Sequence, residues 1–243
     1  MFGSADWSQA FVIAGKEFRD RIRNRWVLAV ALIFALFALA IAYFGSAQQG
    51  EVGFRGIDVT VASLVSLVIY LVPLIALILG YDAIVGEKER GSLDLLLSMP
   101  ITRFEILLGK FLGLSAALGS ATALGFGAGM VALAAQLTTR DAYHYLGFAG
   151  SAILMGMAFL SLSMLVSVLS LDRVRASGTA IGLWFFFVLI FDLLLMGVLV
   201  ASQGTLGSGM FGALLMLNPA DVFRLLNIFT SEQLQSMYGL ATV

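Results

Sequence analysis

The sequence of 243 residues contains no cysteine and a single histidine, His144. These two shortages exclude disulfide bonds, thiol catalysis and metal sites built from Cys or His clusters. A nucleotide-binding loop of the form G-x-x-x-x-G-K-[ST] is also missing, because Gly15-Lys16 and Gly109-Lys110 both lack the upstream glycine and the following Ser or Thr. We therefore expect that this chain is not an enzyme and that it binds no metal and no cofactor itself.

Charged residues are scarce as well. They make up 12% of the sequence, whereas 60% of the residues are hydrophobic and the net charge is −1. Soluble domains carry roughly twice that share of charged residues, so the composition predicts an all-α polytopic membrane protein. The small net charge gives no general attraction to nucleic acid, and we expect no nucleic acid as a partner.

Long apolar runs are what the sequence has in abundance. Five of them are at or above about 20 residues, the length that a helix needs to cross a bilayer. They cover residues 26–44, 59–81, 106–134, 145–171 and 176–202. We therefore predict a single transmembrane domain over residues 1–243, with five complete spans.

Residues 6–25, before the first span, have the pattern of an amphipathic helix that lies on the membrane surface. Trp7, Phe11 and Phe18 fall on one face of this helix, and Glu17 falls on another.

Four glycines in the third span are spaced as pairs of small residues, Gly109-x-x-x-Gly113 and Gly125-x-x-x-Gly129. This spacing lets the backbones of two helices approach closely. We predict that the pairs pack against other helices of the same chain, and a seam between two copies is the alternative.

The placement of Lys and Arg predicts the orientation, because cytoplasmic loops of membrane proteins are enriched in both. Five of these residues precede the first span, four lie in residues 86–110, and two lie in the turn 172–175. Only Arg55, Arg140 and Arg224 lie in the remaining segments. The N-terminus and the loop after the second span are therefore predicted to be cytoplasmic.

The loop 86–105 is the longest charged interruption between two spans, and it contains a short helix. Gly91 breaks the charged end of the preceding helix, and Ser92 is placed to cap a new one with Asp94 in its first turn. Pro100 stops this helix. Its large apolar side chains are Leu93, Leu95, Leu96, Leu97 and Met99.

After this helix, Thr102-x-x-Glu105 is a capping box that opens the third span. A leucine-rich helix of about two turns held outside the lipid is typical of a docking site for a partner. The alternative is a loop helix that lies flat on the lipid surface.

Here the sequence resembles a known family. The run EKERGSLDLLLSMPITR (residues 87–103), followed by Gly109-Lys110, resembles the first cytoplasmic coupling loop of ABC-2-type permeases. KEFRDRIRNRW (residues 16–26) and NPADVFRLLN (residues 218–227) are similar to those members of the family that serve the maturation of nitrous-oxide reductase.

The resemblance implies the permease subunit of an ABC-2 (type V) transporter, working as a homodimer in the bacterial inner membrane with a cytoplasmic N-terminus. A separate cytoplasmic ABC ATPase, which holds ATP and Mg, would dock on the coupling loop and on the turn 172–175. The docking residues that the resemblance implies are Glu87, Glu89, Gly91, Leu93, Leu96, Leu97, Met99, Arg173 and Arg175.

In the nitrous-oxide reductase case, the resemblance further implies a periplasmic β-helical partner and a role in assembly of the copper site. ATP hydrolysis would then drive transport or mechanical work on that partner. The alternative is a general ABC-2 exporter of a lipid, a polysaccharide or a drug-like solute. A secondary transporter is disfavoured, because the spans show neither inverted repeats nor ionisable residues at the midplane.

Residues 203–243 lie outside in this topology and are expected to form short periplasmic helices. Asn218-Pro219 starts one of them, with Asn as the cap and Pro at the first helical position, and Thr230 starts another. The predicted contacts to the periplasmic partner are Asp221, Phe223 and Arg224. The family resemblance implies a sixth span beyond this segment, so either the sequence is truncated or a partner covers the exposed face.

Asp192 is the only carboxylate well inside a predicted span, where an isolated charge is costly. It lies about 16 residues from the cytoplasmic end of its span, or roughly 24 Å along a helix, near the outer interface. We predict a structural hydrogen bond to another helix or to the outer helices.

The ten methionines offer thioether ligands for Cu(I). However, Met155 and Met157 point in opposite directions on one helix, and Met is a common filler of membrane cores. Packing is therefore the favoured interpretation of Met155, Met157, Met164 and Met196, and a copper path is the alternative.

Overall fold

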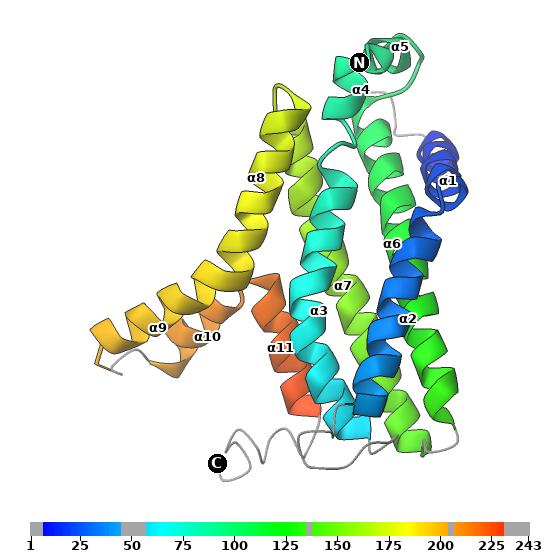
Figure 1. The fold of residues 1–243 in the computed structure, drawn as a ribbon. Coiled ribbons are helices and arrows are strands. Elements are labelled where there is room, and N and C mark those ends of the chain that lie inside the picture. The colour runs from blue at the N-terminus through cyan, green and yellow to red at the C-terminus, as the bar shows by residue number, and fades with distance from the viewer. Residues whose placement is uncertain (1–6, 45–56, 135–137, 204–206, 231–243) are drawn as a thin grey trace.

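The computed structural model describes residues 7–44, 57–134, 138–203 and 207–230, and the regular secondary structure of these residues is entirely helical (Figure 1). The elements are α1 (Trp7–Arg23), α2 (Trp26–Phe44), α3 (Ile57–Gly80), α4 (Val85–Glu89), α5 (Ser92–Leu97), α6 (Arg103–Leu133), α7 (Thr139–Leu169), α8 (Arg173–Phe185), the π-helix η3 (Phe186–Ile190), α9 (Phe191–Ala201), α10 (Ser208–Leu215) and α11 (Pro219–Thr230). The predicted all-α class is confirmed.

The long helices α2, α3, α6 and α7 form a bundle, and α8 runs beside them (Figure 1). Aromatic rings fill its core: the ring centroid of Phe126 lies 5.1 Å from those of both Phe34 and Phe148. The Tyr145 hydroxyl donates a hydrogen bond of 3.0 Å to the carbonyl of Phe126 and so satisfies its polar end inside the bundle. Many of the outer side chains of these helices are apolar and exposed, as a lipid environment requires.

Four of the described helical segments are long and apolar enough to cross a membrane. Two further pairs of helices pass the same test only as bent units, with bends of 63° between α1 and α2 and 112° between α10 and α11. The chain is therefore a multi-span membrane protein with four to six crossings among its described residues. The five-span topology lies inside this range and stays a prediction.

Both glycine pairs of α6 bring a helix of the same chain into close contact. A Cβ atom on Gly113 would lie 2.6 Å from the carbonyl oxygen of Ala14 on α1, and one on Gly125 would lie 2.5 Å from Cβ of Phe34 on α2. Only glycine fits at such distances, so the predicted packing within the chain is confirmed.

Helix α1 lies across the end of α6, and it ends where Arg25 adopts a positive φ of 55° (Figure 1). Ala10 is buried against α6, whereas Trp7 and Phe11 are exposed. Trp7 and Phe11 thus face outward, which suits a helix at a membrane surface, whereas Phe18 is partly buried and packs against the core of the bundle. The face that carries Glu17 was expected to be polar and solvated, but Glu17 is buried.

The helical segment formed by α8, η3 and α9 changes from α-helical to π-helical geometry near its middle. Residues Phe186–Ile190 form a π-helix between α8 and α9, and the chain returns through α10 to α11. The side-chain amide of Asn218, at the start of α11, donates a hydrogen bond of 2.9 Å to the carbonyl of Phe187. Helix α11 therefore begins beside the middle of Arg173–Ala201 and packs on α3 and α7.

Candidate functional site

The candidate site is the end of the bundle that carries α4, α5 and the turn between α7 and α8, called the coupling end below. Gly91 separates α4 from α5 with a φ of 70°, a left-handed conformation that favours glycine, and this predicted break is confirmed. The capping box that opens α6 is also present: Glu105 accepts from the Thr102 amide at 2.7 Å, and Thr102 Oγ1 accepts from the Glu105 amide at 3.2 Å. Ser92 was predicted to cap α5, but it is the first helical residue, and its hydroxyl donates to the carbonyl of Glu87.

Two serines of α7 hold the chain where it leaves α3 and enters α4. The hydroxyl oxygen of Ser167 accepts hydrogen bonds from the backbone amides of Ile84 and Val85, at 2.9 and 3.0 Å. One helical turn away, the Ser163 hydroxyl donates to the carbonyl of Leu77 at 2.6 Å. Both serines are buried. Ser167 thus satisfies two amides at the start of α4 that have no helical acceptor, whereas the carbonyl of Leu77 also accepts from the Tyr81 amide at 3.1 Å.

A buried ion-pair cluster joins α1, α4 and α6. Lys110 is 3% exposed, and its Nζ lies 2.7 Å from Oε1 of Glu17 and 2.7 Å from Oε1 of Glu87. Burial weakens competition from water, so each pair is stronger than it would be on a surface, and loss of one partner would strand a charge. Glu87 was predicted to contact the ATPase; in this structure its carboxylate is turned inward to Lys110, and the contact stays a prediction.

Arg173 connects the start of α8 to the same region. Its Nε lies 2.8 Å from a carboxylate oxygen of Asp82 and 3.2 Å from one of Glu89. The backbone amide of Arg173 also donates to Glu89 at 2.8 Å, and its guanidinium donates to the carbonyl of Gly86 at 3.1 Å. Two predicted docking residues, Glu89 and Arg173, therefore bind each other and fasten α4 to α8.

Arg175, the remaining charged residue of the predicted docking set, is exposed and lies two residues after Arg173 in α8. Its Nε forms an ion pair of 3.1 Å with Asp172, and its backbone amide donates to the same carboxylate, which caps α8.

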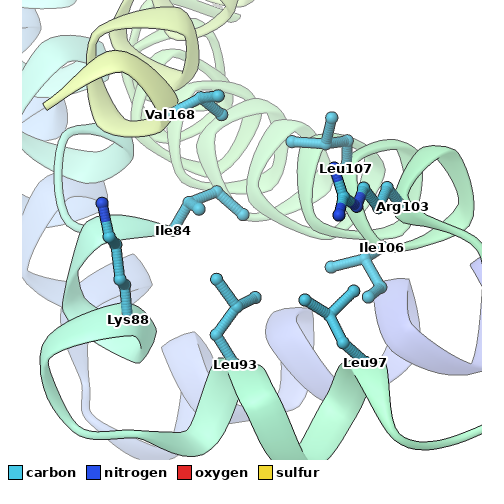
Figure 2. A pocket seen from close by; sticks show the side chains of 8 residues that line it. All are labelled: Ile84, Lys88, Leu93, Leu97, Arg103, Ile106, Leu107 and Val168. Carbon is cyan, nitrogen blue, oxygen red and sulfur yellow. The ribbon is translucent and has the colours of Figure 1, made fainter.

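The short helix α5 has two apolar faces. Leu93 and Leu97 point toward α6 and the end of α7, where they help to line a groove of about 260 Å³ (Figure 2). Leu95 and Met99 point away and are 67% and 52% exposed, and Leu96 is partly buried. The predicted docking leucines are therefore divided, and the outward surface consists of Leu95, Leu96 and Met99.

At the opposite end of the bundle, α11 and α9 share a charged cluster. Arg224 forms ion pairs of 3.0 Å with Asp192 and 2.9 Å with Asp221. Asp192 thus has a hydrogen-bonded partner on α11, as predicted. Asp221 and Phe223 are each 1% exposed, and the ring of Phe223 packs 5.9 Å from that of Phe148. In this structure both belong to the core, and their predicted contact with an outside partner stays a prediction. The second predicted outer helix, which begins at Thr230, falls outside the described residues.

The methionines named above occupy different environments. Met155 and Met164 are buried on α7, whereas Met196 is exposed on α9. Among the described residues, no group of three His, Asp or Glu side chains is placed to hold a metal ion.

Comparison with known proteins identifies the family. The sequence pattern of the family described as “ABC-2 family transporter protein” matches residues 11–237, which is most of the chain. The chain belongs to the ABC-2 family.

Two curated relatives of this ABC-2 permease carry the name “Probable ABC transporter permease protein NosY”. The one from Pseudomonas aeruginosa (strain PAO1) is 50% identical over 222 residues, covering 90% of this chain and 81% of the relative. The one from Stutzerimonas stutzeri is 42% identical over 240 residues, covering 97% of this chain and 87% of the relative. The predicted family membership is confirmed.

Several residues that organise the coupling end of the permease were missed in the sequence. Asp82, Lys110 and Ser167 each bind a partner at least 20 positions away, so no local pattern marks them. The one usable signal was Lys110 itself, because a lysine inside an apolar helix next to a packing glycine requires a buried acidic partner.

Proposed function

We propose that this permease couples ATP hydrolysis by a separate cytoplasmic ABC ATPase to movement of its transmembrane helices. The ATPase docks on the outward surface of α5 (Leu95, Leu96 and Met99) and on the exposed part of the turn 172–175. The N-terminus and the coupling end face the cytoplasm of a bacterium, in line with the concentration of Lys and Arg there.

The observation that carries the proposal is the way α4 is fastened. It is bound to α7 through Ser167, to α8 through Arg173, and to α1 and α6 through Lys110. A force applied to α5 therefore passes through α4 to four other helices at once. The exposed apolar side chains of α5 provide the surface on which a partner applies that force.

The transporter is proposed to contain two copies of the permease. About half of the residues in three of the candidate spans are buried within the chain, but in Arg173–Ala201 this share is 11%. Its exposed apolar residues include Ile181, Leu193 and Val200. This long face supports contact with other membrane helices, including those of a second copy.

We further propose that the work is done on a periplasmic β-helical partner during assembly of the copper site of nitrous-oxide reductase. The support is the resemblance of residues 16–26 and 218–227 to permeases of that system, together with the two relatives named NosY. The ATP and Mg are held by the ATPase.

The experiment is to purify the tagged permease from its native host in mild detergent and to identify co-purifying proteins by mass spectrometry. We expect an ABC ATPase and a periplasmic β-helical protein, in a complex whose native mass contains two permeases. Purification without any ATPase contradicts the coupling proposal.

Deletion of the permease gene tests the copper role separately. We expect nitrous-oxide reductase to accumulate without its complete copper site. Full maturation in the deletion strain, with the ATPase still co-purifying from the tagged strain, would favour a general exporter instead.

A further inference from the structure

We propose that the groove beneath α5 binds one anionic phospholipid, with an acyl chain between its apolar walls and the phosphate between Lys88 and Arg103. The groove is a feature of the permease alone, and this proposal does not depend on docking of the ATPase.

The walls of the groove come from four helical regions. Its apolar lining consists of Ile84, Leu93, Leu97, Ile106, Leu107 and Val168. Figure 2 shows Leu93 and Leu97 pointing from α5 into a space with Ile84 and Val168 on one side and Ile106 and Leu107 on the other. The space holds about 260 Å³ and stays open to the outside, so an elongated apolar group can enter it from the edge.

The charged residues of the groove are all of one sign. Lys88 and Arg103 are its two charged lining residues, they lie on opposite sides, and no acidic side chain lines it (Figure 2). Both are exposed, and within the described parts of the chain neither takes part in an ion pair. Two free cations beside an apolar groove are complementary to a lipid that joins an anionic headgroup to acyl chains.

The depth of the groove matches the headgroup region. Helix α1 has the character of an interfacial helix and contacts α6 at Gly109 and Gly113. Ile106 lies three residues before Gly109, which is about 4.5 Å along α6. The groove is thus less than one helical turn from the level of the helix that marks the membrane surface.

The apolar surface is continuous from the lipid-facing side of α7 into the groove. Leu165 is exposed and lies three residues before Val168, on the same face of α7, and Leu169, four residues after Leu165, is also exposed. A lipid beside α7 can therefore move into the groove without crossing a polar barrier. This continuity favours a lipid over an apolar side chain of a soluble protein as the occupant.

The test uses the absence of native cysteine. Val168→Cys is labelled with bimane, and the full chain is placed in phosphatidylcholine nanodiscs that contain a small fraction of phosphatidylglycerol. Two samples are compared. In one, only phosphatidylglycerol carries brominated acyl chains; in the other, only phosphatidylcholine does. Brominated chains quench bimane on contact. The matched control is Leu154→Cys, an exposed position midway along the same helix.

We expect brominated phosphatidylglycerol to quench the Val168 label several-fold more than its mole fraction predicts, and brominated phosphatidylcholine to show no such excess. Each surface cation contributes about a fivefold preference for anionic lipid, so Lys88→Gln with Arg103→Gln should remove most of this several-fold excess. Quenching of the label at Leu154→Cys should follow the mole fraction of the brominated lipid, whichever lipid carries the bromine. The same result in the Lys88→Gln, Arg103→Gln background shows that this variant is inserted and folded.

Equal quenching of the Val168 label by both lipids overturns the proposal. So does a preference that survives loss of both cations while the Leu154 label behaves normally. If the label shows no lipid preference but is shielded from iodide when the co-purifying ATPase is added, a protein side chain fills the groove, and the lipid assignment is wrong.

Discussion

Lys110 and Glu87 lie on different helices, and Nζ of the lysine is 2.7 Å from Oε1 of the glutamate inside the protein. The same ammonium is 2.7 Å from Glu17 of α1. This arrangement explains how the N-terminal helix becomes part of the coupling end. Helix α1 is held by a charge as well as by the glycine contacts of α6, so it must move with α4 and α6.

Replacing Lys110 with Met should destabilise the permease by roughly 3–5 kcal/mol, because two buried carboxylates lose their shared counter-charge. The measurement is the thermal unfolding midpoint of the detergent-solubilised protein. The triple variant Lys110→Met, Glu17→Gln and Glu87→Gln removes the stranded charges and should recover most of the loss. An unchanged midpoint for the single variant would show that the cluster contributes little.

Gly113→Ala should release α1 from α6. The new Cβ would lie 2.6 Å from a backbone oxygen of α1, which cannot move without shifting the helix. Limited trypsin digestion reports this directly, because α1 contains Lys16 and Arg19, and cleavage there should be faster. Gly127→Ala is the control: its Cβ meets nothing within 4 Å, and cleavage should match the parent. Equal cleavage in both variants argues against the contact.

Ser167→Ala should loosen the junction between α3 and α4. Two buried amides, those of Ile84 and Val85, lose their acceptor, at a cost of about 1–3 kcal/mol for each group left unsatisfied. Hydrogen exchange followed by mass spectrometry should show faster exchange in residues 81–89. Ser161→Ala is the matched control, because that serine is exposed and bonds only within its own helix. Exchange that stays slow in Ser167→Ala would mean that the junction is held by packing alone.

Asp192→Asn and Arg224→Gln should each weaken the attachment of α11 to α9. The double variant should lose less free energy of unfolding than the sum of the losses in the two single variants. The coupling energy from such a cycle should be on the order of 1 kcal/mol, since the two charges are only partly buried. Thermal unfolding of the four proteins gives this value. Strict additivity would show that the ion pair has no role in holding α11.

The features that could be predicted correctly from the sequence are those that depend on residues close to one another in the chain. The long apolar helices, the left-handed break at Gly91 and the Thr102–Glu105 capping box follow from periodicity and local backbone chemistry. The glycine pairs of α6 were also interpreted correctly, because their spacing itself encodes close approach.

Contacts between distant parts of the chain could not be predicted. Glu17 and Lys110 are 93 positions apart, and nothing near either residue shows that they meet. The same holds for α11, whose apolar residues suited an outer surface equally well until the structure placed Phe223 beside Phe148. Glu87 was assigned to docking through the family resemblance, and only the structure shows that its side chain faces inward to Lys110.

The central claim is that the outward surface of α5 receives the ATPase, and co-purification of the ATPase with α5 variants tests it most directly. The informative variant is Leu95→Asp with Met99→Asp, which changes only exposed side chains, and Tyr143→Asp is an exposed control on the first turn of α7, at the opposite end of the bundle. We predict that the α5 variant inserts normally but co-purifies with at least tenfold less ATPase than the parent, whereas the control co-purifies with the parental amount. Retention of the ATPase at the parental level by the α5 variant would contradict the account.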